Sequence, residues 1–285
     1  MSVKHASVQF ALLLFILSQL ACAPRPAEGQ ETPALVKQTL VAELQAARDT
    51  GQPMCYRLRK SSPRFTSTKE ICETKDGAVA RLVALNDQPL NASDEEREQA
   101  RLNDLLSNPS RQRHRKQSQD ADTERVLKIL RALPSAFQYT SMGQSSELGM
   151  TVEKFRFQPN PRFDPPNLET LALTEMAGEL WIEPAQKHIV RLDGHLIQDV
   201  NFGWGILGQL DKGGWIRIDQ RDVGGGHWRI THLQLAMTGR VVLKSKSFST
   251  DEATTDFTPI ATTTTYTQAV QLLRSGTLVQ AQASR

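Results

Sequence analysis

The sequence is poor in cysteine, in aromatic residues and in excess charge of either sign. It has three cysteines in 285 residues and no Cys-x-x-Cys spacing, which argues against a redox role. The formal net charge is +3 with both signs interspersed, which argues against a nucleic-acid partner, since such a protein shows a concentrated basic face. Beyond the N-terminal segment, no apolar run is long enough for a membrane-spanning helix. The composition is that of a soluble protein.

The first 29 residues have the pattern of a signal peptide. Lys4 and His5 give a basic start, an apolar run over 10–17 follows, and small residues come next. Cleavage after Gly29 would release a soluble protein. Cleavage before Cys22 would leave a lipidated cysteine, because the residues preceding it resemble the end of a lipobox. Both routes stay open, and both predict an exported, periplasmic protein, in the second case anchored to a membrane.

Cys55 and Cys72 are the two cysteines that remain under either route. Both lie in strand-like runs, and a hairpin centred on Pro63-Arg64 places them directly opposite each other. An oxidising compartment would then close the loop, which contributes about 3 kcal/mol for a loop of this size. We therefore predict a structural disulfide.

One domain over residues 30–250 is expected after the signal peptide. A helix is predicted over 30–51 because apolar residues recur there at three- and four-residue spacing. Two helical segments predict a helical insertion at about 93–134, and most of 137–249 alternates as strands do. Short glycine-containing connections there, including Thr238-Gly239, indicate an antiparallel meander. Residues 251–285 form a Thr-rich tail in which we expect a short helix.

The most informative stretch is 188–202, where apolar and polar residues alternate. Asp193-Gly194 has the composition of a hairpin turn, but a two-residue turn would break an alternation that continues through Gly194. We therefore predict one long strand, bent at Gly194, in a curved sheet or open barrel. Its apolar side is predicted to face a hollow and carries Val190, Leu192, Leu196, Val200 and Phe202.

The run Gly203–Gly208 matches the Gly-x-Gly-x-x-Gly pattern of dinucleotide-binding proteins. That pattern requires a strand before it and a helix after it, whereas a second strand follows here. We expect no cofactor. The run is either an apolar lip at the mouth of a cavity or a tight bend packed on the core.

No constellation of catalytic or metal-ligating residues is apparent. The histidines of the second half lack His-x-His and His-Glu-x-x-His spacing, and no Gly-x-Ser-x-Gly elbow is present. We therefore predict no metal, no catalytic residue and no enzymatic activity. The weakest alternative is a hydrolase that uses His195 with Asp193 and Asp199.

A basic run, Arg111–Lys116, lies between the two predicted helices of the insertion. We interpret it as a solvated linker that precedes a helix starting near Asp122. The functional alternative is contact with anionic lipid headgroups at a membrane surface.

The run Gly178–Asp193, with its Leu-Trp-Ile-Glu-Pro and Ile-Val-Arg-Leu segments, resembles a strand pair of the outer-membrane lipoprotein-sorting superfamily. The order of signal peptide, helix, strands, helical insertion and long-stranded meander resembles the same superfamily. It contains lipoprotein-localisation carriers and receptors and periplasmic sigma-factor regulators. The resemblance implies an incomplete barrel around an apolar cavity, with helices as a lid, that holds acyl chains.

We therefore predict a mainly β (α+β) fold, with a long-stranded antiparallel sheet curved into an incomplete barrel, an N-terminal helix and a helical lid insertion. The predicted function is non-enzymatic binding of acyl chains or lipoproteins by a monomer. The alternative is an envelope protein-interaction or stress-sensing module without a lipid ligand. The candidate cavity residues are Phe155, Phe157, Trp181, Val190, Leu192, Leu196, Val200, Phe202, Trp204, Ile206, Leu207 and Trp215.

Overall fold

The computed structural model describes residues 32–48, 51–202, 208–241 and 244–276. The chain divides into two units, Met1–Glu31 and Thr32–Arg285, and all described residues belong to the second. The predicted signal peptide and Cys22 therefore lie outside the described residues. No helix in the described part is long and apolar enough to cross a membrane.

The described strands form one 13-stranded sheet, mostly in the order β4-β3-β2-β1-β13-β12-β11-β8-β7-β6-β5. The pairings are antiparallel, and β10 joins β9 to β12 off this path. The strands are β1 Met54–Ser61, β2 Thr66–Cys72, β3 Val79–Leu85, β4 Gln88–Pro89, β5 Phe137–Glu147, β6 Met150–Pro159, β7 Met176–Glu183, β8 His188–Leu196, β9 Val200–Phe202, β10 Gly208–Leu210, β11 Trp215–Asp222, β12 Trp228–Val241 and β13 Lys244–Pro259.

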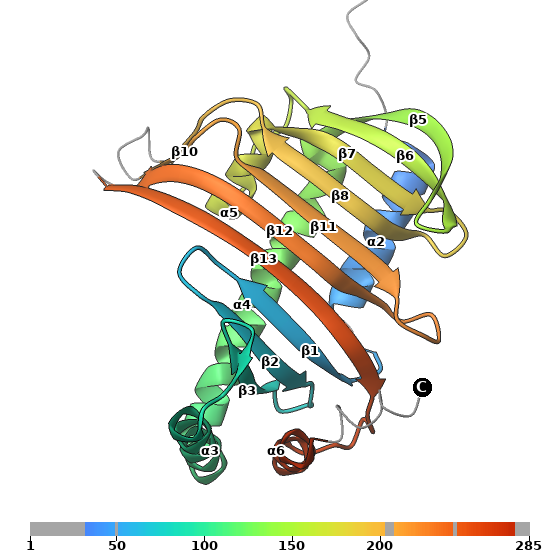
Figure 1. Ribbon diagram of the computed structural model, residues 1–285. Helices are drawn as coiled ribbons and strands as arrows, with labels where there is room; N and C mark the ends of the chain where they lie inside the picture. The colour runs from blue at the N-terminus through green and yellow to red at the C-terminus, as the bar shows by residue number, and fades with distance from the viewer. Residues whose placement is uncertain (1–31, 49–50, 203–207, 242–243, 277–285) are drawn as a thin grey trace, which may run out of the picture. The chain divides into compact units, whose positions relative to one another are not determined.

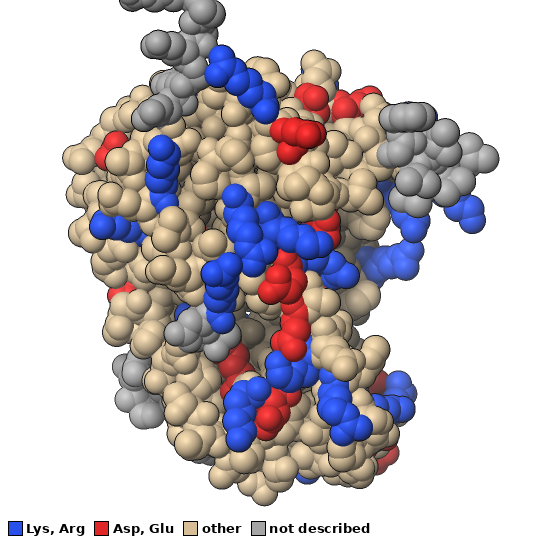
Figure 2. Space-filling view, turned by 180° about the vertical axis from the view of Figure 1, so that it is seen from behind, with Lys and Arg blue, Asp and Glu red and all other residues tan. Residues whose placement is uncertain are grey.

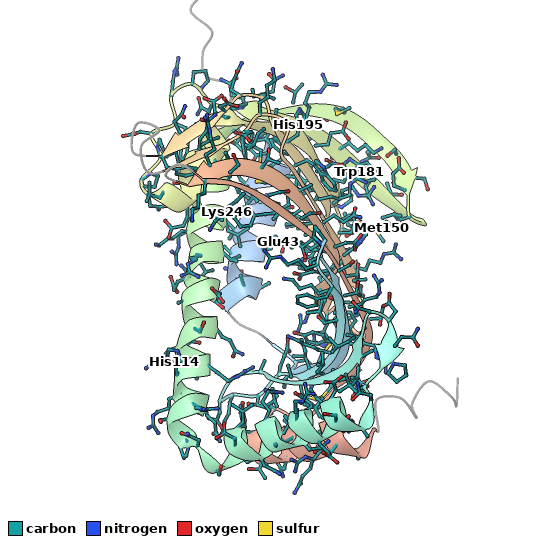
Figure 3. All side chains as sticks on the ribbon, turned by 60° about the vertical axis from the view of Figure 1, so that its left-hand side comes forward. Glu43, His114, Met150, Trp181, His195 and Lys246 are labelled. Carbon is teal, nitrogen blue, oxygen red and sulfur yellow. A yellow bond between two sulfur atoms is a disulfide. The ribbon has the colours of Figure 1, made fainter. Side chains whose placement is uncertain are left out.

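The helices lie mainly on one side of this sheet. Figure 1 shows α2 and α4 behind it, and Figure 3 shows the sheet curving around the space that faces α4. The helices are α2 Ala34–Arg48, α3 Ala92–Ser107, α4 Pro109–Ala136, α5 Leu168–Leu171 and α6 Tyr266–Ser275, with a 3-10 turn at Ala172–Glu175. The sheet is open, and the mainly β prediction with an N-terminal helix and a helical insertion is confirmed.

The β1–β2 hairpin forms as predicted. Cys55 lies opposite Cys72 in its register, and the two are joined by a disulfide. Both cysteines are fully buried in a small core with Val79 of β3 and Val270 and Leu273 of α6. The disulfide thus holds the two strands on which the C-terminal helix packs.

Strand β8 runs straight through Gly194, as the alternation predicted. Gly194 pairs with Gly178 on one side and Ile216 on the other. A side chain there would meet Met176, whose sulfur lies 3.0 Å from an ideal Cβ, so the glycine allows close packing and makes no turn. The prediction of one strand to Phe202 is wrong, because β8 ends at Leu196 and Val200–Phe202 form the separate strand β9, which pairs with β10.

A β-bulge places Val190 on the face of the sheet opposite to the predicted one. Trp181 pairs with Arg191 but its neighbour Ile182 pairs with Ile189, so Val190 is an extra residue in β8. An extra residue moves the side chains before it to the other face. Val190 is buried against Val152 instead of sharing a core with Leu196.

The basic run Arg111–Lys116 lies within α4, so its prediction as a linker is wrong. Asn108 accepts a hydrogen bond from the backbone N–H of Arg111, and Pro109 occupies the first turn, where its missing N–H costs nothing. These two residues start the helix 13 positions before the predicted Asp122.

The end of the sheet also differs from the prediction. Thr238-Gly239 is no turn, because β12 continues through it to pair with β10. A Cβ on Gly239 would lie 2.3 Å from the carbonyl oxygen of Gln209, so the glycine is needed for the approach of β10. Strand β13 continues to Pro259, which places residues 251–259 of the predicted tail in the sheet. The short helix expected in the tail is α6.

Candidate functional site

A cavity of about 610 Å³ lies between the curved sheet and the helices α2 and α4. This volume is within the range of small-molecule binding sites, about 300–1,000 Å³. The space-filling view from the helix side shows the surface hollowed there (Figure 2). The apolar wall is formed by Leu58, Ile189, Leu192, Ile218, Ile230 and Leu233 of the strands and by Val126, Leu130 and Leu133 of α4.

The strand register builds this wall. Leu192 of β8 pairs with Ile218 of β11, and Ile218 pairs with Leu233 of β12. Directly opposed residues on neighbouring strands point to the same side of a sheet. Leu192, Ile218 and Leu233 therefore form a continuous apolar row, hereafter the apolar row, across the floor of the cavity.

The other half of the same face is filled by the protein's own side chains. Phe155, Phe157, Leu196 and Val200, all predicted to line the hollow, are at most 2% exposed. They pack in the main core with residues of α2 and α4, including Val36, Leu40, Leu133 and Ala136. These four residues therefore belong to a packed core and do not line the hollow for which they were predicted.

The remaining predicted cavity residues are spread over the molecule. Leu192 lines the cavity, and Phe202 packs at the edge of the main core. Trp181 lies on the opposite face, where its ring is covered by Lys154 Nζ at 4.0 Å (Figure 3). Trp215 is 37% exposed. Trp204, Ile206 and Leu207 lie outside the described residues.

A buried carboxylate, that of Glu43, marks one end of the cavity (Figure 3). Glu43 extends from α2, is 8% exposed, and accepts a hydrogen bond of 2.9 Å from the backbone N–H of Ile189. His188 Nδ1 lies 3.2 Å from the same oxygen, and its ring stacks on Trp228 at 4.9 Å. Sequence analysis missed Glu43, because its partners are about 145 residues away and no local pattern relates them.

A second carboxylate of the cavity wall, Glu73, accepts a hydrogen bond from the backbone N–H of Met54. Burial raises the pKa of Glu73, against the lowering effects of that N–H and of Arg229. Burial and the charge of Glu73 raise the pKa of Tyr56 to about 12. The cavity therefore combines an apolar floor with two carboxylates in its wall, those of Glu43 and Glu73.

Two exposed apolar side chains show where the cavity opens. Val126 of α4 is 50% exposed and Ile230 of β12 is 44% exposed, and both line the cavity. Because both side chains line the cavity and are partly exposed to solvent, the cavity wall meets the surface at these two residues. We define Val126 and Ile230 as the mouth of the cavity.

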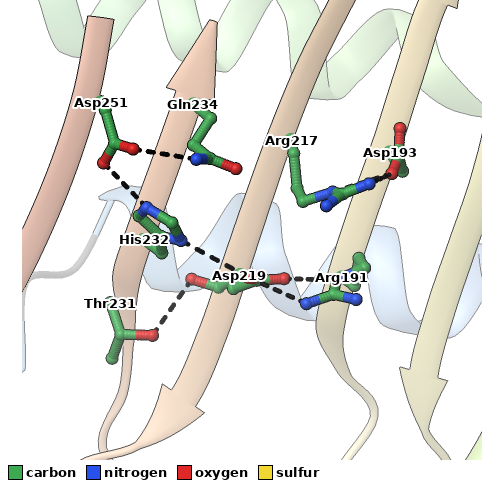
Figure 4. Close-up of polar contacts among 8 residues, drawn as sticks. All are labelled: Arg191, Asp193, Arg217, Asp219, Thr231, His232, Gln234 and Asp251. Atoms are coloured by element: carbon green, nitrogen blue, oxygen red, sulfur yellow. Dashed lines mark hydrogen bonds and ion pairs between the residues drawn. The ribbon is translucent and has the colours of Figure 1, made fainter.

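The opposite face of the sheet carries a row of ion pairs (Figure 4). Arg191 donates two hydrogen bonds to Asp219, at 2.5 and 3.0 Å. His232 Nε2 lies 2.9 Å from Asp251, whose other oxygen accepts from Gln234. This row links β8, β11, β12 and β13 on the side away from the cavity.

The carboxylates of the hydrolase alternative are bound to other partners. Arg217 donates to Asp193 with an Nε–O distance of 2.8 Å. Asp199 accepts from the backbone N–H of Lys212 and from Gln209. Among the described residues, no group of three or more His, Cys, Asp or Glu side chains is placed to hold a metal ion.

No protein-family model and no curated protein matches the chain. Among solved structures, it is similar to a domain from Vibrio parahaemolyticus classed as an outer membrane lipoprotein-sorting protein, with 11% identity and a TM-score of 0.32 over 85% of this chain and 99% of that one. It is also similar to MucB in its complex with MucA(peri), with 9% identity and a TM-score of 0.22 over 83% and 96% of the two chains. Both structures are of the kind that the sequence resembles, but at these TM-scores neither similarity carries an argument about this chain.

Proposed function

We propose that this protein is a non-enzymatic binding protein of the cell envelope that holds an acyl chain, free or on a lipoprotein, in the cavity beneath α2 and α4. The observation that carries this proposal is the apolar row of Leu192, Ile218 and Leu233 on the floor of a 610 Å³ cavity. The buried disulfide supports a location outside the cytoplasm, since such bonds persist in oxidising compartments.

The physical argument concerns the water that would otherwise fill the cavity. At about 30 Å³ per molecule, the volume corresponds to on the order of 20 waters. Along the apolar row such waters have no hydrogen-bond partners on the protein side. An acyl chain that displaces them gains about 0.8 kcal/mol for each buried methylene. The polar end near Glu43 leaves room for a headgroup with hydrogen-bond donors.

The test is thermal denaturation of detergent-free protein against a panel of single-chain amphiphiles. We expect the melting temperature to rise, because a ligand that binds only the native state stabilises it. The mouth variants Val126→Glu and Ile230→Glu should weaken binding by about tenfold or more, since a carboxylate must then be desolvated next to the chain.

Matched controls separate loss of binding from loss of folding. Leu168 is 61% exposed and Phe65 is 53% exposed, and neither lines the cavity. Leu168→Glu and Phe65→Glu should therefore keep the melting shift of the wild type. A melting temperature that stays constant across the whole panel would refute the proposal.

The protein-interaction module is the second candidate, and the packed half of the concave face favours it. Phe155, Phe157 and Leu196 leave no space for a ligand there. Lipid extraction of natively expressed protein distinguishes the two functions. A stoichiometric acyl species supports the carrier, whereas lipid-free protein that co-purifies with a partner supports the interaction module.

A further inference from the structure

The hairpin of β12 and β13 extends past its neighbouring strand. Strand β1 pairs with β13 from Ser61 opposite Asp251 to Met54 opposite Pro259. The preceding segment of β13, Lys244–Thr250, is paired with β12 on one side only among the described strands. Figure 1 shows this end of the hairpin projecting beyond β1. We call Lys244–Ser249 the free segment.

The free segment has two distinct faces. Lys244, Lys246 and Phe248 point to one side, because alternate residues of a strand share a face, and the intervening serines point to the other. All six side chains are exposed, and Phe248 is 48% exposed. Figure 3 shows Lys246 on the side of the sheet that faces α4. The lysine face is thus on the same side as the cavity.

The charges of this face differ from those of the basic run in α4. There Arg111 pairs with Asp104 and Lys116 pairs with Asp120, whereas Arg113 and Arg115 form no ion pair with a described residue. Figure 2 shows acidic and basic side chains interspersed along the helix side of the molecule. Lys244 and Lys246 form no ion pair within the described part of the chain. The free segment differs from the basic run because an exposed aromatic ring lies beside its unpaired lysines.

Lysines on a free edge strand also prevent two sheets from pairing edge to edge. That role explains Lys244 and Lys246 but leaves the exposed ring of Phe248 without a purpose. An aromatic ring beside two unpaired lysines fits an anionic bilayer, in which the ring enters the headgroup region and the ammonium groups contact phosphates.

We propose that the free segment docks the protein on an anionic lipid surface through Lys244, Lys246 and Phe248. Strand β13 continues from this segment to Glu252 and Thr254, which line the cavity. Docking would therefore place one end of the cavity-forming strand at the membrane. The proposal does not depend on what the cavity binds.

The test is co-sedimentation of residues 30–285, which lack the predicted signal peptide and Cys22, with vesicles of phosphatidylcholine alone or with about one third phosphatidylglycerol. We expect binding to the anionic vesicles only, and weaker binding at high salt because salt screens surface charges. A lysine near an anionic surface contributes about fivefold in affinity, so Lys244→Gln/Lys246→Gln should bind about 25-fold more weakly. Phe248→Ser should weaken binding at both low and high salt, because salt screens charges and not apolar contacts.

The controls carry the same changes elsewhere on the surface. Lys75 and Lys187 are exposed and lie in turns at the other end of the strands, so Lys75→Gln/Lys187→Gln removes the same charge away from the free segment. Met142 of the far edge strand β5 is 45% exposed, so Met142→Ser matches Phe248→Ser. Both controls should bind as the wild type does. Equal binding to neutral vesicles, no sedimentation of the wild type, or equal loss in the controls would overturn the proposal. Melting shifts with soluble amphiphiles, unchanged in the hairpin variants, report on the cavity separately.

Discussion

Lengthening the acyl chain of a ligand perturbs the proposed cavity directly. Each added methylene that reaches the apolar row of Leu192, Ile218 and Leu233 leaves water for an apolar surface. At about 0.8 kcal/mol per methylene, each step should tighten binding by up to fourfold. Six added methylenes contribute at most about 5 kcal/mol, and chain ordering reduces this figure.

The volume of the cavity also limits the chain length beyond which added methylenes no longer increase affinity. A methylene is close to a water molecule in size, so a cavity of 610 Å³ holds on the order of 20 of them at most. Affinity should rise steeply through medium chain lengths and level off once the chain extends past the mouth at Val126 and Ile230.

Isothermal titration calorimetry below the critical micelle concentration measures both effects. The heat capacity change of binding should become more negative with chain length, because apolar burial has that signature. The Ile230→Glu variant should lower the affinity of the whole series. A dissociation constant that does not change between short and long chains would refute the reasoning, since the headgroup alone would then account for binding.

Three further predictions concern stability. Replacing Cys55 and Cys72 by serine should lower the free energy of unfolding by about 3 kcal/mol, measured by urea denaturation, because the disulfide closes a loop with a sequence separation of 17. Tyr139→Phe should lower the free energy of unfolding by about 1–2 kcal/mol in the same assay, because the buried hydroxyl of Tyr139 donates a hydrogen bond to the carbonyl of Leu133 near the end of α4. The hydrogen bond from Gln234 holds the pKa of Asp251 below its ordinary value. Asp251 therefore stabilises the fold above pH about 4, and this contribution is lost as the pH falls through the lowered pKa. Asp251→Asn should make the free energy of unfolding depend less on pH in the acidic range.

Local patterns predicted the parts of the fold that depend on neighbouring residues. The β1–β2 hairpin and its disulfide followed from alternation on both sides of Pro63-Arg64. The continuity of β8 through Gly194 followed from side-chain phase alone. In each case the strands that pair are close in sequence or the period is unbroken, so little long-range information was needed.

The bulge at Val190 could not be located from the alternation of apolar and polar residues alone. Ile189 and Val190 are adjacent apolar residues, and one of them must face away from the row that contains Leu192. That adjacent pair was the available signal for a bulge. Which residue is extra depends on the register of β7, where Trp181 and Ile182 meet the bulge, and this register is set by tertiary packing.

Helix α4 was predicted only in its apolar half. Its first half is polar on all sides, which in a sequence indicates a loop as readily as a helix that crosses open space. Arginine, lysine and glutamine are good helix formers, and Pro109 marks a helix start, so propensity and capping held the missing information.

The composition of α4 explains why the concave face is only half filled. Toward the C-terminal end, Leu130 and Leu133 reach the main core, where Phe155 and Phe157 meet them. Toward the N-terminal end, the side-chain amide of Gln119 forms two hydrogen bonds with the backbone of Ala78, the residue that precedes β3. These bonds hold the helix on that side. Between these supports the helix presents Val126 and Thr123 to the cavity, and neither is large enough to reach the opposite wall. The hollow therefore follows from a helix fixed at both ends with small side chains between them, and replacing Thr123 by a large apolar residue should reduce its volume from the helix side.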